Sequence, residues 1–67
     1  MGEWKLVSSD NEHKFFLNDT LVIHAFKVNE LWHGNVLGLN KVFCDKSLTS
    51  VLKQAELGAI SCGWIKE

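Results

Sequence analysis

The sequence predicts an α+β fold, with a small antiparallel sheet of three to four strands and one C-terminal helix packed on one face. Short runs of alternating apolar and polar residues fill the first half of the chain, and pairs of turn-forming residues separate them. The last third changes to a helical period. Residues 1–67 are expected to form a single domain, which is too small to enclose a deep catalytic cleft.

Four runs are predicted as strands, each bounded by polar or turn-forming residues: Glu3–Ser8, Lys14–Leu17, Thr20–Val28 and Leu31–Leu39. A polar turn over residues 9–13 separates the first two. The pairs Asn18-Asp19 and Asn29-Glu30 suit two-residue hairpin connections between the others. Residues 40–43 are expected to extend the last run after a bend.

A helix is predicted from Lys46 to Ser61, because apolar residues recur along one stripe: Leu48, Val51, Leu52, Ala55, Ala59 and Cys62. Asp45 or Ser47 can cap its start, and Gly63 suits the position after its end. Gly58 leaves an alternative open, in which the helix ends there and residues 59–65 form a last strand. A straight helix would hold Cys44 and Cys62 too far apart for a disulfide, so both are expected to be buried free thiols.

If both residue pairs form true two-residue turns, side-chain alternation assigns the strand residues to two faces. One face is almost entirely apolar and is expected to receive the helix: Phe16, Leu21, Ile23, Ala25, Trp32, Gly34, Val36 and Gly38. Its two glycines are expected to mark a close approach of the helix backbone. A slip of one residue in either turn would exchange the faces of a strand, so this assignment depends on the register.

The other face mixes aromatic, imidazole and amide side chains. Besides Val22, it holds the candidate partner-binding residues, which are His13, Phe15, His24, Phe26, His33, Asn35 and Leu37. Exposed apolar surface beside polar groups is typical of protein interaction sites, whose buried centres are enriched in aromatic residues. Three alternatives stay open: an ordinary half-exposed sheet face, a metal site built from the three histidines, and a homodimer that pairs edge strands or buries this face.

Composition and motifs argue against several classes of function. The seven basic residues are all lysines in a chain of net charge −1, which disfavours direct nucleic-acid binding. The chain has no nucleophile elbow, P-loop or paired catalytic motif, so we expect no enzymatic activity, no metal and no cofactor. It has no signal-peptide pattern and no apolar run of membrane-spanning length, which predicts a cytoplasmic protein without membrane contact.

The predicted helix begins near "FCDKSL" (residues 43–48) and runs through "QAE" (residues 54–56), and tryptophans lie near both ends of the chain. Together with the short sheet, this layout resembles small bacteriophage-encoded host-takeover proteins, among them anti-CRISPR proteins. The likeness spans most of the chain but has no diagnostic motif, so it carries over no binding residue. It implies a non-enzymatic inhibitor that occludes a surface of a larger host defence complex in the host cytoplasm.

Overall fold

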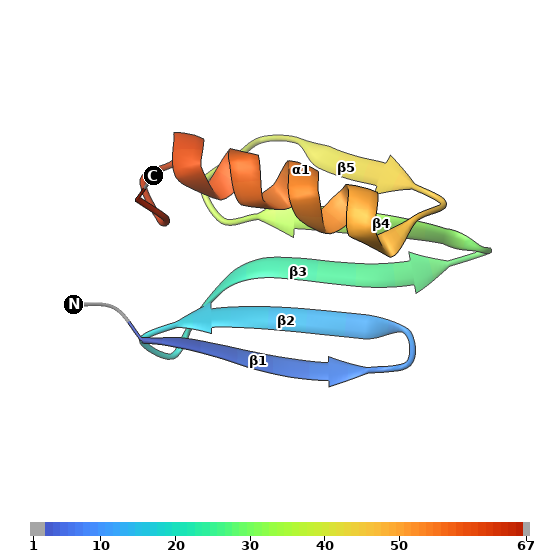
Figure 1. Cartoon of the computed structure of the whole chain (residues 1–67), viewed down its shortest axis with the longest axis horizontal. Coiled ribbons are helices and arrows are strands. Elements are labelled where there is room, and N and C mark those ends of the chain that lie inside the picture. Colours follow the sequence, from blue (N-terminus) through green and yellow to red (C-terminus); the bar gives the residue numbers. More distant parts are fainter. Residues whose placement is uncertain (1–2, 67) are drawn as a thin grey trace.

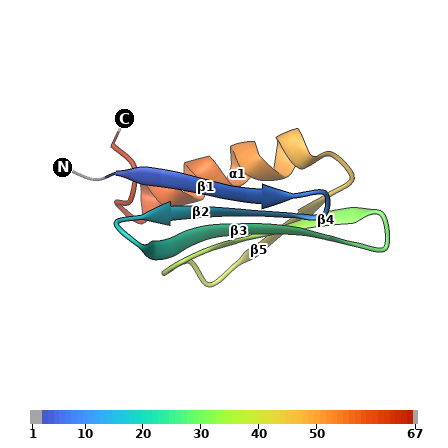
Figure 2. The same ribbon diagram turned by 90° about the horizontal axis from the view of Figure 1, so that it is seen from below.

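A computed structural model describes residues 3–66 and shows five strands followed by one helix (Figure 1). The elements are β1 (Trp4–Ser9), β2 (Glu12–Leu17), β3 (Thr20–Val28), β4 (Leu31–Val36), β5 (Val42–Asp45) and α1 (Leu48–Ser61). The strands lie in the sheet in chain order, and each neighbouring pair is antiparallel. Because α1 lies on one side of the sheet (Figure 2), the predicted α+β class is confirmed, with one more strand than the upper end of the prediction.

The two predicted hairpin turns form because their central residues adopt the left-handed conformation. The φ angles are 51° and 67° at Asn18 and Asp19, and 51° and 66° at Asn29 and Glu30. Positive φ at both central residues defines the type I′ turn, whose twist matches that of the flanking strands. Across the second turn, His24 lies opposite Asn35, so the predicted register between β3 and β4 is confirmed.

The pairing between β2 and β3 differs from simple alternation because β3 contains a bulge. Phe16 lies opposite Leu21, whereas Phe15 lies opposite Ile23, so Val22 is an extra residue in β3. A bulge of this kind leaves two adjacent residues facing one on the partner strand. Accordingly, Val22 and Ile23 are both buried, although they are consecutive. The bulge reverses the predicted faces of β2 and of the first residues of β3.

Two further boundaries differ from the sequence prediction. The first turn consists of Asp10 and Asn11 alone, so β2 begins earlier, at Glu12. At the other end, β4 stops at Val36 and the chain reverses. Residues 42–45 then form a separate strand that pairs back against β4, rather than an extension of it. Gly38 lies in this reversal with φ +87°. A Cβ there would lie 4.0 Å from Cys62 Sγ, an ordinary contact distance, so the predicted close approach of the helix at Gly38 is wrong.

The helix follows the longer of the two predicted alternatives. Ser47 is the N-cap, and its hydroxyl accepts a hydrogen bond from the backbone N–H of Ser50. At the other end Gly63, with φ +86°, donates to Ile60, and Trp64 donates to the carbonyl of Ala59. These two bonds form a Schellman motif, which satisfies the free carbonyls of the last turn.

The core lies between α1 and strands β3 to β5. It is formed by small and aliphatic residues of the helix and sheet together with one ring: Val22, Ile23, Val36, Phe43, Ala55 and Ala59. Two glycines permit the close packing. A Cβ on Gly34 would lie 2.7 Å from Val51 Cγ1, and a Cβ on Gly58 would lie 2.8 Å from Leu39 Cδ2. The predicted close approach at Gly34 is therefore confirmed, and Gly58 is retained inside the helix because β5 and the preceding loop pack against it.

The cysteines are both free, as predicted, but they are not both buried. Cys44 is exposed because it lies opposite His33 on the side of the sheet away from the helix. Cys62 caps the helix and packs against the core.

Candidate protein-binding surfaces

The side of the sheet that faces away from α1 is not covered by any other part of residues 3–66 (Figure 2); we call it the open face. Strand register and side-chain alternation place on it Val7, Glu12, Lys14, Phe16, Leu21, His24, Phe26, His33, Asn35, Val42 and Cys44. Leu37 borders the same surface just after β4, in a shallow depression shared with His24 and Asn35. The predicted binding residues His24, Phe26, His33, Asn35 and Leu37 therefore lie together.

Aromatic and imidazole rings form the centre of the open face. Phe26 and His33 lie opposite each other on β3 and β4, and their ring centroids are 5.4 Å apart in a stacked arrangement. The His24 ring lies 5.1 Å from Phe26 on its other side. These three side chains are half-buried, and ring contacts of this kind hold each ring in a defined orientation before any partner binds.

A small charged cluster lies beside these rings. His24 Nε2 donates a hydrogen bond to Glu12 Oε2 at 2.7 Å, and Lys14 Nζ lies 3.7 Å from the other carboxylate oxygen. The hydrogen bond from His24 lowers the pKa of the Glu12 carboxyl below its ordinary value, and the positive charge of Lys14 acts in the same direction. His24 and Lys14, the two partners of the Glu12 carboxylate, thus both lie on the open face. The hydrogen bond to Glu12 holds the His24 ring in position.

Two predicted binding residues lie on the other side of the sheet, because the bulge reverses β2. His13 lies opposite Ala25, and its ring packs against Trp32 with centroids 5.5 Å apart. Phe15 lies opposite Ile23 and packs against the core. Their assignment to the candidate face is therefore wrong.

The same reversal removes the geometric basis of the three-histidine metal site. His13 is separated by the sheet from His24 and His33, so the three rings cannot converge on one ion. Within residues 3–66, no group of three or more His, Cys, Asp or Glu side chains is placed to hold a metal.

Glu12, Lys14 and Phe16 also lie on the open face, although the sequence pattern did not predict them there. One signal points to the cause: Leu21, Val22 and Ile23 are three consecutive apolar residues in a strand that otherwise alternates. In a bulge, two adjacent residues can lie on the same side of the strand, so a run of consecutive apolar residues is compatible with one. The pattern does not, however, determine which residue is the extra one.

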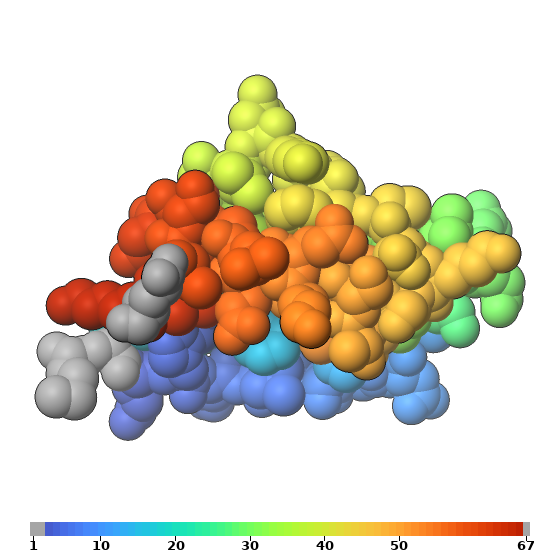
Figure 3. Space-filling model, turned by 45° about the horizontal axis from the view of Figure 1, so that its top comes forward, coloured from blue at the N-terminus to red at the C-terminus, as the bar shows by residue number. Residues whose placement is uncertain are grey.

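A second surface, the helix-side groove, lies between α1 and the first two strands. A five-stranded sheet is about 19 Å across, and a helix with its side chains covers only about 10–12 Å. Since α1 packs over β3 to β5, the helix side of β1 and β2 is left partly uncovered, as Figure 3 shows in blue and cyan. The groove has a volume of about 480 Å³ and is lined by Trp4, Phe15, Ile23, Thr49, Leu52, Lys53, Glu56 and Ile65.

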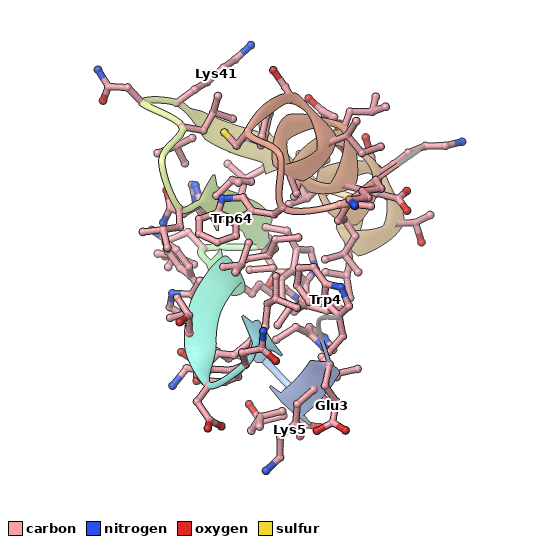
Figure 4. The ribbon with its side chains drawn as sticks, turned by 90° about the vertical axis from the view of Figure 1, so that its left-hand side faces the viewer. Glu3, Trp4, Lys5, Lys41 and Trp64 are labelled. Carbon is pink, nitrogen blue, oxygen red and sulfur yellow. The ribbon has the colours of Figure 1, made fainter. Side chains whose placement is uncertain are left out.

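The two terminal tryptophans lie near one end of the sheet (Figure 4). Trp64 folds back so that its indole Nε1 donates to the backbone carbonyl of Leu37 at 2.7 Å. Trp4 lies on the helix side of β1, where it is 40% exposed and forms part of the groove wall. The groove could not be found from the sequence, because it depends on which strands the helix covers.

No helix within residues 3–66 is long and apolar enough to cross a membrane. A comparison of the chain with protein-family models, with curated proteins and with solved structures found no match in any of the three.

Proposed function

We propose that the protein is a non-enzymatic protein-binding module that uses its open face to occlude a surface of a larger protein. The observation that supports this proposal is the composition of the face. The stacked pair of Phe26 and His33 lies on its inner strands β3 and β4, and the exposed aliphatic side chains of Val7, Leu21 and Val42 lie on the same face. Burial of such apolar side chains by a partner stabilises a complex by roughly 25 cal/mol for each Å² removed from water.

The shape of the open face favours a protein over a small molecule as the partner. The face is one side of a continuous five-stranded sheet, and the depression beside Leu37 and His24 is shallow. Small ligands are usually bound in concave sites that enclose most of their surface. A broad surface with an aromatic centre and a polar cluster at its side resembles the anatomy of protein–protein interfaces.

We take the proposed class of partner, a host defence complex in the cytoplasm, from the resemblance of this layout to phage-encoded host-takeover proteins. In that role the protein would act by steric occlusion, since tight binding of one rigid face is sufficient to block a surface. No chemical step is needed for such inhibition. The charged cluster of Glu12, His24 and Lys14 would add orientation within the contact.

The test is quantitative capture of a partner from a lysate of the bacterial host, followed by affinity measurement with the purified partner. We expect Phe26→Ala combined with His33→Ala to weaken binding at least tenfold, because centrally placed aromatic residues carry most of the energy of an interface. Leu57→Ala is the matched control, since Leu57 is an equally apolar residue, 63% exposed on α1, away from the open face. Circular dichroism verifies that both variants are folded.

Retention of full affinity by the folded double variant would contradict the proposal. Equal loss of affinity in Leu57→Ala would also contradict it, because the contact would then include the helix layer. Loss in the double variant alone supports the open face as the binding surface.

The helix-side groove favours a second candidate, binding of a small apolar ligand. Its volume of about 480 Å³ and its apolar lining are typical of such sites. A titration with a fluorescent apolar probe such as anilinonaphthalene sulfonate tests it, with Leu52→Asp as the variant that should abolish the signal. An unchanged signal in that folded variant would exclude the groove as a ligand site.

A further inference from the structure

Strand β1 is an unprotected edge of the sheet. It pairs with β2 on one side only, and no other strand within residues 3–66 lies along its outer side. All its residues are exposed, including the apolar side chains of Trp4, Leu6 and Val7. Edge strands of monomeric proteins are usually blunted by charges, proline, bulges or short length, because their free backbone groups pair readily with another strand. β1 has six residues and one charge, that of Lys5.

The opposite edge is better protected. β5 has only four residues, and the chain leads from it directly into α1. It is flanked by the charged residues Lys41 and Lys46 and ends in Asp45. Figure 4 shows Lys5 and Lys41 at opposite ends of the molecule, which correspond to these two edges. Pairing with another strand is therefore expected at β1.

The backbone groups that β1 offers are determined by its pairing with β2. The N–H of Asn18 donates to the carbonyl of Glu3 at 3.1 Å, so the backbone groups of Glu3 point toward β2. Because these directions alternate along an antiparallel strand, Lys5, Val7 and Ser9 also point toward β2. The N–H and C=O groups of Trp4, Leu6 and Ser8 consequently point outward from the sheet.

We propose that a second copy of the chain pairs with this edge, β1 against β1 in the antiparallel direction, with Leu6 opposite Leu6 of the partner subunit. In this register Trp4 lies opposite Ser8 of the partner subunit, so every outward-pointing group of the strand finds a hydrogen-bond partner. Lys5 lies opposite Val7 of the partner subunit, which leaves the two ammonium groups apart.

The neighbouring registers are less favourable. A two-fold axis perpendicular to the sheet keeps both helices on the same side. It also allows a register in which Lys5 is opposite Lys5 of the partner subunit, and one in which Val7 is opposite Val7 of the partner subunit. The Lys5-centred register opposes like charges and leaves Ser8 unpaired. The Val7-centred register places Trp4 against Asp10 in the turn, outside the strand. Only the Leu6-centred register pairs all the outward-pointing residues of β1 without placing like charges opposite each other.

The resulting dimer would have one continuous ten-stranded sheet with both helices on one side and both open faces on the other. The doubled open face would offer two equivalent binding surfaces to a partner. Self-association through β1 does not depend on the function proposed above, because β1 and its outward groups lie at the edge of the open face.

Sedimentation over a range of concentrations tests the dimer. We expect a species of twice the 7.6 kDa chain mass that dissociates on dilution. Leu6→Lys should abolish this species, since it places two like charges on the two-fold axis. Leu57→Lys should retain it, because it changes an equally exposed leucine on the helix. A monomer at every concentration, or a dimer that survives Leu6→Lys, would overturn the proposal.

Cross-linking tests the register, in a background with Cys44→Ser because that thiol is exposed. Lys5 and Val7 of the partner subunit form a non-hydrogen-bonded pair with Cα atoms about 4.5 Å apart, within the range of a disulfide. A mixture of Lys5→Cys and Val7→Cys chains should therefore form a linked dimer on oxidation. Each variant alone should not, since identical positions lie diagonally and too far apart. Formation of the disulfide-linked dimer by either variant alone, to the same extent as in the mixture, would refute this register.

Discussion

Replacement of Gly34 by alanine tests how closely the helix approaches the sheet. The new methyl group would lie 2.7 Å from Val51 Cγ1, well inside van der Waals contact. Val51 is fully buried and β-branched, so its side chain has few alternative rotamers. Removal of a strand glycine alone would stabilise the fold by about 0.5–1 kcal/mol, whereas overpacking of a core costs about 1–3 kcal/mol.

We therefore expect Gly34→Ala to lower the free energy of unfolding by about 1–2 kcal/mol, measured by urea denaturation followed by tryptophan fluorescence and circular dichroism. Val51→Ala removes the methyl group that the new Cβ would meet. A double-mutant cycle of the two substitutions should consequently show a favourable coupling of about 1 kcal/mol or more. Unchanged stability in Gly34→Ala, or strictly additive effects in the cycle, would refute the close approach of α1 to β4.

Three other substitutions test local features of the structure. Glu30→Gly should raise the free energy of unfolding by about 1 kcal/mol in denaturant titrations, because a glutamate at φ 66° is strained and glycine is not. Glu12→Gln should be less stable than the parent at neutral pH. Since the folded-state pKa of Glu12 is lowered by its bond to His24, the difference should persist above the ordinary carboxyl pKa of 4.5 and disappear as the pH falls through the lower folded value. Ser47→Ala should lower stability by about 0.5–1 kcal/mol through loss of the cap on Ser50, and an unchanged midpoint would show that the cap contributes nothing.

Much of the fold follows from local signals that act within a few residues. Asn18, Asp19 and Asn29 adopt the left-handed conformation more readily than most residues, which favours the two-residue turns, and the turn at Asn29-Glu30 fixes the register between β3 and β4. The helix is determined by its apolar stripe, by the Ser47 cap and by Gly63 at its end. Each of these features depends on the chemistry of the residues themselves.

The candidate face was harder to predict, because one extra residue in a strand reverses the direction of its partner. With the bulge at Val22, both Val22 and Ile23 are buried in the core, and Ile23 lies opposite Phe15. Consequently, His13 and Phe15 lie on the helix side, and Glu12 and Lys14 lie beside His24 on the open face. The separate strand β5 was not predicted because the chain reversal over residues 37–41 is longer than a two-residue hairpin turn and lacks its sequence signal.

The histidines provide the most direct test of binding at the open face, because they report separately on the two sides of the sheet. His24 and His33 lie on the open face, whereas His13 packs against Trp32 on the helix side. We would record the imidazole proton signals by NMR during titration with the captured partner. If the open face binds the partner, the signals of His24 and His33 should shift or broaden while that of His13 stays unchanged. A response confined to His13 would contradict binding at the open face and place the binding surface on the helix side.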